Sequence, residues 1–329
     1  VSLIVSLEAE NFRLFRKRHW TFHRDINFLW GANGSGKTSL LEALYLFSYG
    51  RSFRTSQRRE LINALGPLRL KLMILTQESS HELLFHFDGK RCLRLRDGKP
   101  SSALEFISDL FSLYLGTPLI FEVFTSRKGV LRWIDSLCAG LDSLYIRELF
   151  RYNKVLESRN RLLRDGKVNN FEFEVWNDKF IEGARRILER RVHLLKELNL
   201  KLKGRGVSLQ LYGSSLRGPA PIDEEMRLKK SLWGPHLDGV RFLGDERDLR
   251  IFGSTGLWKT AFFSVVEAFS SLFQERKGQR PLLLVDDFDA DLDRDHQGIS
   301  LESIRGQAVL TYVTSGLFSD RTGCSFLEV

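Results

Sequence analysis

Cysteine is scarce in this sequence, with 3 among 329 residues, and the three lie far apart as Cys92, Cys138 and Cys324. An odd number at such spacing favours neither a disulfide framework nor a zinc site, and it fits a reducing compartment. No uninterrupted apolar run reaches the roughly 18 residues that a membrane span needs. Glu8 and Glu10 also interrupt any apolar segment of a secretory signal. We therefore expect a cytoplasmic protein without a membrane partner.

The remaining composition is that of an ordinary folded chain. Hydrophobic residues make up 43 % and charged residues 28 %, which argues against fibrous, low-complexity and disulfide-scaffold classes. The length is that of about two domains. Lys and Arg number 50 against 41 Asp and Glu, a formal net charge of +9. This excess is compatible with a polyanionic partner such as nucleic acid.

A glycine-rich loop carries the clearest chemical motif. Residues 31–38 read G-A-N-G-S-G-K-T and match G-x-x-x-x-G-K-[ST] in full, between an expected strand at 26–30 and an expected helix at 39–47. In such a loop backbone N–H groups surround phosphates, Lys37 neutralises the β and γ oxygens, and Thr38 supplies a ligand to Mg²⁺. We therefore predict that ATP with Mg²⁺ is held by Gly31, Ala32, Asn33, Gly34, Ser35, Gly36, Lys37, Thr38 and Ser39.

An acidic pair follows a second apolar stretch. Residues 281–285 predict a buried strand, and Asp286 and Asp287 come directly after it. Beside a phosphate loop, such carboxylates are typical of metal and water chemistry. We predict that Asp286 holds Mg²⁺, directly or through water. Asp287 would orient or deprotonate the attacking water, with Lys37 as the other catalytic residue. Without the loop, the same pair is often a solvated strand end.

Secondary structure changes character along the chain. Stretches at 70–76, 83–87 and 91–96 predict further strands, so the first third is α/β with antiparallel additions. Apolar residues at three- and four-residue steps then predict two helices, 141–164 and 175–202. Because few glycines and prolines interrupt this part, a helical hairpin or arm is the simplest interpretation.

The last third returns to mixed structure. A helix is expected at 259–273 and a buried strand at 308–314. Nearly the whole chain separates the phosphate loop from the acidic pair, so a large insertion lies between them. We expect boundaries near residues 116 and 220, so that 117–220 form a helical arm inserted between 1–116 and 221–329, the two parts that the family resemblance described below identifies as an ATPase head.

The middle of the chain is strongly basic. From Arg147 to Arg205 there are 16 Lys and Arg against 9 Asp and Glu. Two interpretations stay open for these helices: an ordinary solvated surface, or a surface that contacts DNA or another partner.

The order of the motifs resembles that of one family. A phosphate loop and an acidic strand separated by a helical arm follow the plan of the SMC and RecF group of ABC-type ATPases. In RecF order, the chain then has N-F-R at 11–13, L-L-E-A-L at 40–44, G-R-S-F-R-T at 50–55, G-P-H at 234–236, F-G-S-T-G at 252–256, D-D at 286–287 and D-L-D at 291–293. The chain thus resembles bacterial RecF from end to end, although its helical middle matches mainly in character.

The resemblance implies a fold and a mode of action. The expected fold class is α/β: an ABC-type P-loop ATPase head, with a mixed sheet and flanking helices, plus an inserted helical arm. Ser254 and Gly256 would form a signature loop that meets the γ-phosphate of ATP held by a second protomer. ATP would therefore join two heads into a homodimer, and slow hydrolysis would release them. The segment 289–293 would lie at the same contact.

The resemblance also implies partners. RecF proteins act in recombinational and replication-gap repair, bind duplex DNA and single-strand/double-strand junctions, and with RecO and RecR help to load RecA. Few aromatic platforms are identifiable here, which favours backbone contacts over stacking on single strands. Besides the basic arm, phosphate contacts would come from Arg13, Arg16, Lys17, Arg18, Arg51, Arg54, Arg58 and Arg59.

Three positions depart from the family pattern. Leu257 replaces the usual Gln of the signature, Leu237 replaces the Arg after G-P-H, and Val130-Leu131 replaces an expected pair of arginines. These changes remove polar groups near the presumed dimer and arm surfaces. Whether hydrolysis and dimerisation survive them stays open, as does whether Gln57 or Gln77 senses the metal.

Two other functions stay open. An ATPase-inactive DNA-binding scaffold would keep the basic arm without turnover. Another ABC-type ATPase with a helical insertion would act on a toxin, a nuclease or another protein partner. A conventional P-loop kinase fits least, because no small-substrate pocket or lid motif is recognisable.

Overall fold

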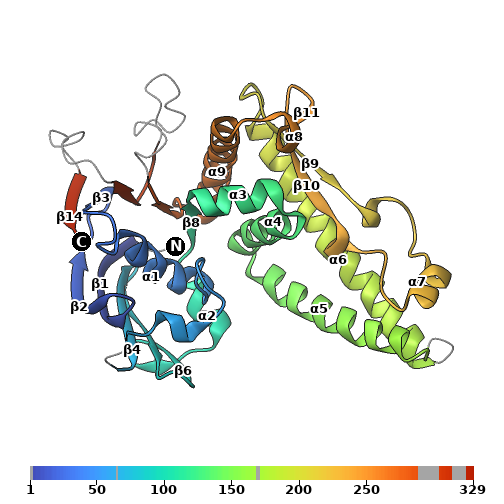
Figure 1. The fold of residues 1–329 in the computed structure, drawn as a ribbon, viewed down its shortest axis with the longest axis horizontal. Coiled ribbons are helices and arrows are strands. Elements are labelled where there is room, and N and C mark those ends of the chain that lie inside the picture. The colour runs from blue at the N-terminus through green and yellow to red at the C-terminus, as the bar shows by residue number, and fades with distance from the viewer. Residues whose placement is uncertain (1–2, 64–65, 168–170, 288–303, 313–323) are drawn as a thin grey trace. The chain divides into compact units, whose positions relative to one another are not determined.

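The structure, a computed structural model, describes residues 3–63, 66–167, 171–287, 304–312 and 324–329 (Figure 1). The chain divides into two compact units. Unit 1 contains residues 1–120 and 273–329, and unit 2 contains 121–272. Two helices, α3 (Thr117–Thr125) and α9 (Thr255–Lys277), cross the boundary between the units.

A parallel sheet of unit 1 carries the two chemical motifs. Its strand order is β14-β3-β13-β12-β8, and all its pairings are parallel. The strands are β3 (Ile26–Trp30), β8 (Ser112–Leu115), β12 (Leu282–Val285), β13 (Ala308–Tyr312) and β14 (Cys324–Glu328). The strands expected at 26–30, 281–285 and 308–314 are confirmed as far as the description reaches, since 313 and 314 lie outside it. Because β3 and β12 both run parallel to β13, which lies between them, the loops that follow β3 and β12 leave the same edge of the sheet.

A second, antiparallel sheet of unit 1 has the order β2-β1-β4-β5-β6-β7. Its strands are β1 (Leu3–Phe12), β2 (Phe15–Thr21), β4 (Leu68–Leu75), β5 (Ser80–Phe87), β6 (Cys92–Arg96) and β7 (Lys99–Pro100). The strands expected near 70–76, 83–87 and 91–96 are confirmed. The β1–β2 hairpin was not predicted, because only Phe15 and Trp20 of β2 are buried, and three charged residues and a histidine between them hide the alternation.

Helix α1 (Lys37–Tyr49) lies in the core of unit 1. Nearly all of its side chains are buried, as is typical of a helix that is covered on every side. One hydrophobic cluster joins Leu44 and Phe47 of α1 to Leu72 of the antiparallel sheet and Leu284 of the parallel sheet. Helix α2 (Ala103–Ser108) also packs on it through Phe106. The helix after the phosphate loop is therefore fixed on both sides.

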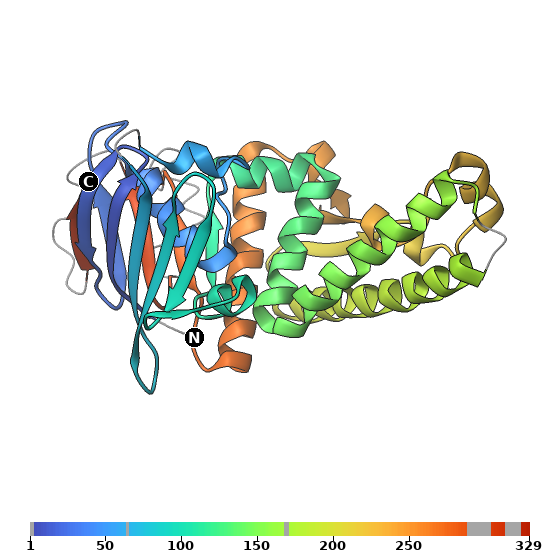
Figure 2. The same cartoon turned by 90° about the horizontal axis from the view of Figure 1, so that it is seen from below.

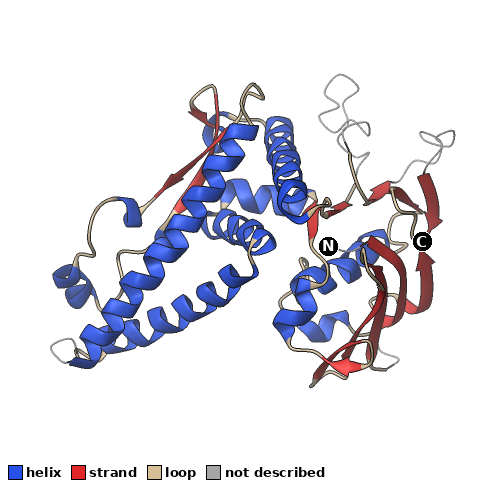
Figure 3. Ribbon diagram, turned by 180° about the vertical axis from the view of Figure 1, so that it is seen from behind, coloured by secondary structure: helices blue, strands red, loops and turns tan. Residues whose placement is uncertain are grey.

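Unit 2 is mainly helical (Figure 3). Its longest helices, α5 (Ser143–Arg164) and α6 (Phe171–Lys201), pack side by side as the expected hairpin, which Figure 2 also shows. The other elements are α4 (Arg127–Leu141), β9 (Ser208–Tyr212), α7 (Ile222–Leu228), β10 (Gly239–Gly244), β11 (Arg247–Asp248) and α8 (Leu249–Phe252). No helix in the described part of the chain is both long and apolar enough to cross a membrane.

The division of the chain differs from the expected boundaries. Residues 221–272, expected in the head, lie in unit 2 together with 121–220. Two contacts explain this grouping. Strand β10 pairs with β9 along its length, and Glu225 of α7 forms an ion pair with Arg159 of α5. The sequence offered no sign of either contact, because both join segments far apart in the chain.

His236 lies in a short turn, Pro235–Leu237, within unit 2. Its Nδ1 is 2.7 Å from the Tyr152 hydroxyl. Burial, aided by the charges of Arg127, Arg159 and Arg191, lowers the pKa of His236 to about 4. The folded protein therefore holds this imidazole neutral at a pH where an unfolded chain would begin to protonate it.

We expect this histidine to make unfolding depend on pH. Because the pKa of His236 is lower in the folded protein than in the unfolded chain, the unfolded chain takes up a proton first as the pH falls. The resulting loss of stability begins near pH 6.5 and continues toward pH 4, and it amounts to about 2 kcal/mol between pH 7 and pH 5. Urea unfolding at the two pH values measures it. The variant His236→Gln should lose this dependence, whereas His193→Gln, at a side chain that is 63 % exposed, should keep it. An equal pH dependence in all three proteins would contradict the assignment.

Candidate functional site

The glycines of the phosphate loop adopt backbone angles that other residues avoid. Gly34 has φ +82° and Gly36 has φ +114°, in the left-handed region that favours glycine. A Cβ on Gly36 would lie 2.5 Å from the ring of Phe15, whereas a Cβ on Gly34 would meet no atom of the described residues within 4 Å. The backbone at Gly34 is therefore open to a ligand.

The polar groups of the loop point into it. Lys37 is only 7 % exposed, and its Nζ donates to the carbonyl oxygens of Gly31 (2.6 Å) and Ala32 (3.1 Å). The buried Ser35 hydroxyl has no hydrogen-bond partner among the described residues. The first N–H groups of α1, which begins at Lys37, have no acceptor within the helix. A positive charge, a free hydroxyl and helix amides thus meet in one loop, which suits an anion.

Asp286 joins the acidic strand to this loop. Its Oδ1 accepts hydrogen bonds from the hydroxyls of Thr38 (3.2 Å) and Thr311 (2.8 Å), and its Oδ2 accepts one from the Tyr114 hydroxyl (3.3 Å). Burial raises the pKa of Asp286, the charge of Asp287 adds to this, and the three hydrogen bonds oppose it. The fold therefore brings Thr38 and Asp286, far apart in sequence, into direct contact.

Thr311 and Tyr114 were not identified from the sequence. They lie on β13 and β8, the two strands that flank β12. Burial and the nearby charge of Asp286 raise the pKa of Tyr114, so its hydroxyl stays protonated and can donate. Both strands are fully buried, and only the strand order shows which of their side chains meet Asp286.

Asp287 has a different environment from Asp286. Its side chain is exposed, and its backbone has φ +52°, a conformation that Asp and Asn tolerate better than most residues. Its N–H donates to the Thr311 hydroxyl (2.8 Å). The Thr311 hydroxyl therefore contacts both acidic residues: it donates to the side chain of Asp286 and accepts from the backbone N–H of Asp287. The segment 289–293, expected at the dimer contact, lies outside the described residues.

A buried carboxylate on α1, that of Glu42, has several polar partners. Glu42 is fully buried and receives two hydrogen bonds from Arg13, at 2.8 and 2.6 Å, and one from Ser52. The guanidinium of Arg54 lies 3.6 Å from the same carboxylate and 3.4 Å from Ser39. Arg13 was predicted to contact DNA phosphate; its charge is instead neutralised by Glu42, so it anchors the β1–β2 turn to α1.

The signature residues lie at the start of α9. The Ser254 hydroxyl accepts from the N–H of Leu257 (3.2 Å), and the Ser254 carbonyl accepts from that of Trp258 (3.0 Å). Ser254 therefore caps the helix, which begins at Thr255, earlier than the expected residue 259. Ser254 and Gly256 are both exposed. These residues belong to unit 2, whereas the phosphate loop belongs to unit 1.

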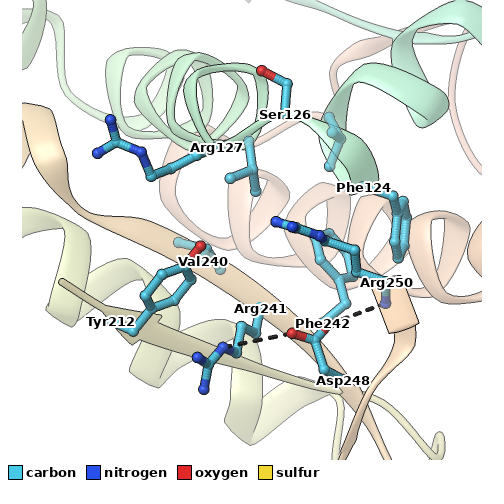
Figure 4. Close-up of a pocket in the computed structure, with 11 residues that line it drawn as sticks. Phe124, Ser126, Arg127, Tyr212, Val240, Arg241, Phe242, Asp248 and Arg250 are labelled. Carbon is cyan, nitrogen blue, oxygen red and sulfur yellow. Dashed lines mark hydrogen bonds and ion pairs between the residues drawn. The ribbon is translucent and has the colours of Figure 1, made fainter. Parts of the chain in front are cut away.

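A small basic cavity also lies in unit 2, and Figure 4 shows its lining. Its interior is about 20 Å³. Arg241 lies 3.5 Å from Asp248 and 4.5 Å from the ring centre of Tyr212, and Asp248 accepts the N–H of Arg250 at 3.0 Å. A space of this size suits one or two water molecules, so it is no second nucleotide site.

Many arginines of the helical hairpin are paired. Arg190 binds Asp142 and also Glu148 (3.0 Å), and Arg186 binds Glu182. Buried arginines are paired as well. Arg191 binds Asp135 (2.8 Å) and the Pro235 carbonyl (2.7 Å), and Arg159 binds Glu225 (2.6 Å). Part of the positive charge counted from Arg147 to Arg205 is therefore neutralised within the fold.

The departures from the family pattern lie in different environments. Val130 and Leu131 are 2 % and 6 % exposed, so they belong to the core of unit 2 and remove no polar group from a surface. Leu257 is 45 % exposed. Of the two glutamines considered as a metal sensor, Gln57 is exposed and precedes a 3₁₀ turn. The amide nitrogen of Gln77 lies 3.9 Å from the position that a Cβ on Gly278 would take.

A magnesium ion fits the residues at Asp286. Among the described residues no three His, Cys, Asp or Glu could hold a metal by themselves. Mg²⁺ bound with a nucleotide needs only one or two protein ligands, since phosphate and water supply the others. The Thr38 hydroxyl and the Asp286 carboxylate, 3.2 Å apart, are oxygen ligands of the kind that Mg²⁺ takes.

The chain is similar to known proteins of the RecF and SMC group. Residues 3–85 match the family model described as the RecF/RecN/SMC N terminal domain. The DNA replication and repair protein RecF of Thermomicrobium roseum is 29 % identical over 372 residues, which cover 95 % of this chain and 94 % of that protein. The RecF of Lachnoclostridium phytofermentans is also 29 % identical, over 334 residues that cover 94 % and 92 % of the two chains.

Solved structures agree in fold. The recombination mediator protein RecF with ATP, of the RecFOR pathway, has a TM-score of 0.84 at 21 % identity and covers 98 % of this chain and 94 % of its own. An SMC head bound to the C-winged helix domain of ScpA has a TM-score of 0.53 at 16 % identity, with 95 % and 90 % covered. The resemblance that the motifs indicated is thus confirmed: this chain is similar to RecF over about 95 % of its length and has the fold of RecF and SMC ATPase heads.

Proposed function

We propose that this chain is a RecF-like, ATP-dependent DNA-binding protein of recombinational and replication-gap repair. The observation that carries the proposal is the contact between Thr38 and Asp286, which sets the acidic strand against an open phosphate loop. The relatives are DNA replication and repair proteins by name, and one solved relative holds ATP. Phosphates would be bound by the backbone of residues 31–36, by Lys37, and by the first amides of α1, up to Ser39.

Thr38 and Asp286 would hold the Mg²⁺ that accompanies ATP. The ion would supply charge neutralisation on the phosphate oxygens. Lys37 would neutralise the same oxygens from the loop side. Asp287, exposed and fixed by its backbone to Thr311, would position and deprotonate water. Tyr114 and Thr311 would act as positioning residues, because they orient the Asp286 carboxylate without reaching the nucleotide.

The signature loop would complete the site of a second protomer. Ser254 and Gly256 are exposed at the start of α9, where helix amides and a hydroxyl suit a phosphate. ATP bound to one head would therefore contact the signature of another, which makes dimerisation dependent on ATP. Leu257 adds an exposed apolar side chain at this position in place of a polar one. Hydrolysis would release the dimer, so ATP acts as a switch. DNA, RecO, RecR and RecA would be the partners of this state.

The test is sedimentation of the wild type and of Lys37→Ala, with and without ATP-Mg²⁺. We expect ATP to raise the dimer population of the wild type at least tenfold. Lys37→Ala should stay monomeric, because the loop loses the charge that holds the phosphates. A gapped duplex added to the same samples should sediment with the wild-type dimer alone.

The control is Lys196→Ala, at an exposed side chain of α6. It removes the same charge outside the loop, and it should assemble like the wild type. If Lys37→Ala and the wild type respond alike to ATP, nucleotide is irrelevant and a DNA-binding scaffold remains. If ATP drives assembly but no DNA is bound at low salt, an ATPase that acts on a protein partner remains.

A further inference from the structure

The loop that follows α1 places an aromatic ring in the core of unit 1. Phe53 is half-buried and packs against the hydrophobic cluster that surrounds α1. The residues on either side of it are held by polar contacts: Ser52 donates to Glu42, and the Arg54 guanidinium lies 3.4 Å from the Ser39 hydroxyl. The backbone at Phe53 is therefore fixed relative to α1, and its ring has a defined place.

The ring of Phe53 stacks on the ring of Tyr114. Their centres are 4.0 Å apart and their planes differ by 19°. Tyr45 of α1 has an edge-to-face arrangement with both rings, with its centre 5.2 Å from that of Phe53 and 6.0 Å from that of Tyr114. Stacked and edge-to-face pairs are the geometries that aromatic rings favour. Because Phe53 packs on its face, the Tyr114 ring is restrained from tilting.

A glycine leaves the space that the Tyr114 hydroxyl occupies. A Cβ on Gly116 would overlap this hydroxyl and would lie 2.5 Å from the ring carbon that carries it. Any other residue at 116 would therefore push the hydroxyl away, since such a distance is far below van der Waals contact. The stacked ring of Phe53 and the missing side chain at Gly116 together give the Tyr114 hydroxyl one position.

The orientation of the Asp286 carboxylate depends on that position. Thr38 and Thr311 both donate to Oδ1, whereas Tyr114 donates to Oδ2 at 3.3 Å. A carboxylate held at one oxygen can rotate about its Cβ–Cγ bond, and a hydrogen bond at the second oxygen prevents this rotation. The backbone is fixed as well, because the N–H of Asp286 donates to the Leu115 carbonyl at 2.8 Å. The Tyr114 ring is therefore the adjustable part of this contact.

We propose that Phe53 is a positioning residue for the binding of Mg²⁺ at Asp286, an inference that rests on the proposed function. The Phe53 ring holds the Tyr114 ring, and the Tyr114 hydroxyl holds the carboxylate. Removing a group that orients a metal ligand typically lowers metal affinity 10–100-fold. Because Phe53 acts through Tyr114, its removal matters only while the hydroxyl at 114 is present. The loop after α1 is thus linked to the metal ligand, although it touches no ligand atom itself.

The experiment measures how much Mg²⁺ tightens nucleotide binding to the full chain. The dissociation constant of a fluorescent ATP analogue, methylanthraniloyl-ATP, is determined in EDTA and at saturating Mg²⁺, and the ratio of the two values is the Mg²⁺ factor. The variants are Phe53→Ala, Tyr114→Phe and the double variant. Phe53→Tyr keeps a stacked ring. The matched control Phe326→Ala removes a ring that stacks on Phe28 at 5.4 Å elsewhere in unit 1.

We expect the Mg²⁺ factor to fall about tenfold in Tyr114→Phe and about threefold or more in Phe53→Ala. The double variant should match Tyr114→Phe alone, because the two changes act on one contact. Phe53→Tyr and Phe326→Ala should keep the wild-type factor. The affinity in EDTA should be the same in every variant, since the phosphate loop is unchanged. Urea unfolding confirms that each variant is folded. If Phe53→Ala is not, Phe53→Leu, which keeps an apolar side chain without a ring, replaces it.

Two results would overturn the role of Phe53 alone. A wild-type Mg²⁺ factor in Phe53→Ala would show that the ring is not needed. A larger loss in the double variant than in Tyr114→Phe would show that Phe53 acts by another route than the hydroxyl. In both cases the wild type still responds to Mg²⁺ and the proposed function stands. If Mg²⁺ does not tighten binding to the wild type, the assignment of the ion to Thr38 and Asp286 is wrong, and the role of Phe53 is wrong with it.

Discussion

Arg159→Met is expected to destabilise unit 2 by about 3–5 kcal/mol, the usual cost of removing one partner from a buried ion pair. Arg159 and Glu225 are both fully buried, 2.6 Å apart. The guanidinium also donates to Asn177 (3.0 Å) and Ser231 (2.7 Å), and it lies 4.6 Å from the ring centre of Phe180. Methionine replaces the volume but leaves the Glu225 carboxylate without its counter-ion.

A second substitution separates charge from packing. The other oxygen of Glu225 accepts the backbone N–H groups of Leu232 (2.7 Å) and Trp233 (3.2 Å). Glu225→Gln keeps an oxygen for these groups and removes the charge. The double variant Arg159→Met/Glu225→Gln should therefore recover about 1–2 kcal/mol of the loss, because no buried charge remains unpaired.

Urea unfolding measures the free energies of these variants. Arg186→Met is the control, since Arg186 pairs with Glu182 one helical turn away at a side chain that is 46 % exposed, and we expect it to cost less than about 1 kcal/mol. Equal losses in Arg159→Met and Arg186→Met would show that the buried pair does not hold α5 and α7 together.

The same ion pair shows what sequence patterns do not reveal. The charges at Arg159, Arg190 and Arg191 looked like part of a basic surface, because a pattern of residue types does not say which cation meets which anion. Their partners Glu225, Asp142 and Asp135 lie 66, 48 and 56 residues away in the chain. Only the packing of the helices joins them, so charge reversal at Arg190 or Arg191 would test folding before it tested DNA binding.

The phosphate loop was predictable because its chemistry is local. The angles of Gly34 and Gly36 favour glycine, and the residues proposed to bind phosphate follow one another in the chain. Asp286 was predictable for a similar reason, as a carboxylate at the end of an apolar strand. Thr311 and Tyr114 were not, because their role depends on the order of β8, β12 and β13 in the sheet, and that order leaves no trace in the pattern of any one strand.

The second large effect is expected at Asp287. Asp287→Asn should lower ATP hydrolysis at least 100-fold, the usual contribution of a general base, and should leave ATP-driven dimerisation intact. Asn accepts the left-handed backbone at φ +52°, so the bond from the N–H of residue 287 to Thr311 persists. The substitution therefore removes the basic carboxylate and little else.

Asp286→Asn is the informative comparison. It removes the charge that would hold Mg²⁺ beside Thr38, so we expect weaker nucleotide binding at low Mg²⁺ as well as slow hydrolysis. Steady-state phosphate release gives the rate, and sedimentation with ATP-Mg²⁺ gives the dimer fraction for each variant. A long-lived dimer in Asp287→Asn, with none in Lys37→Ala, would place hydrolysis after assembly. An unchanged hydrolysis rate in Asp287→Asn would remove Asp287 from the reaction and leave the Asp286 side of the site to activate water.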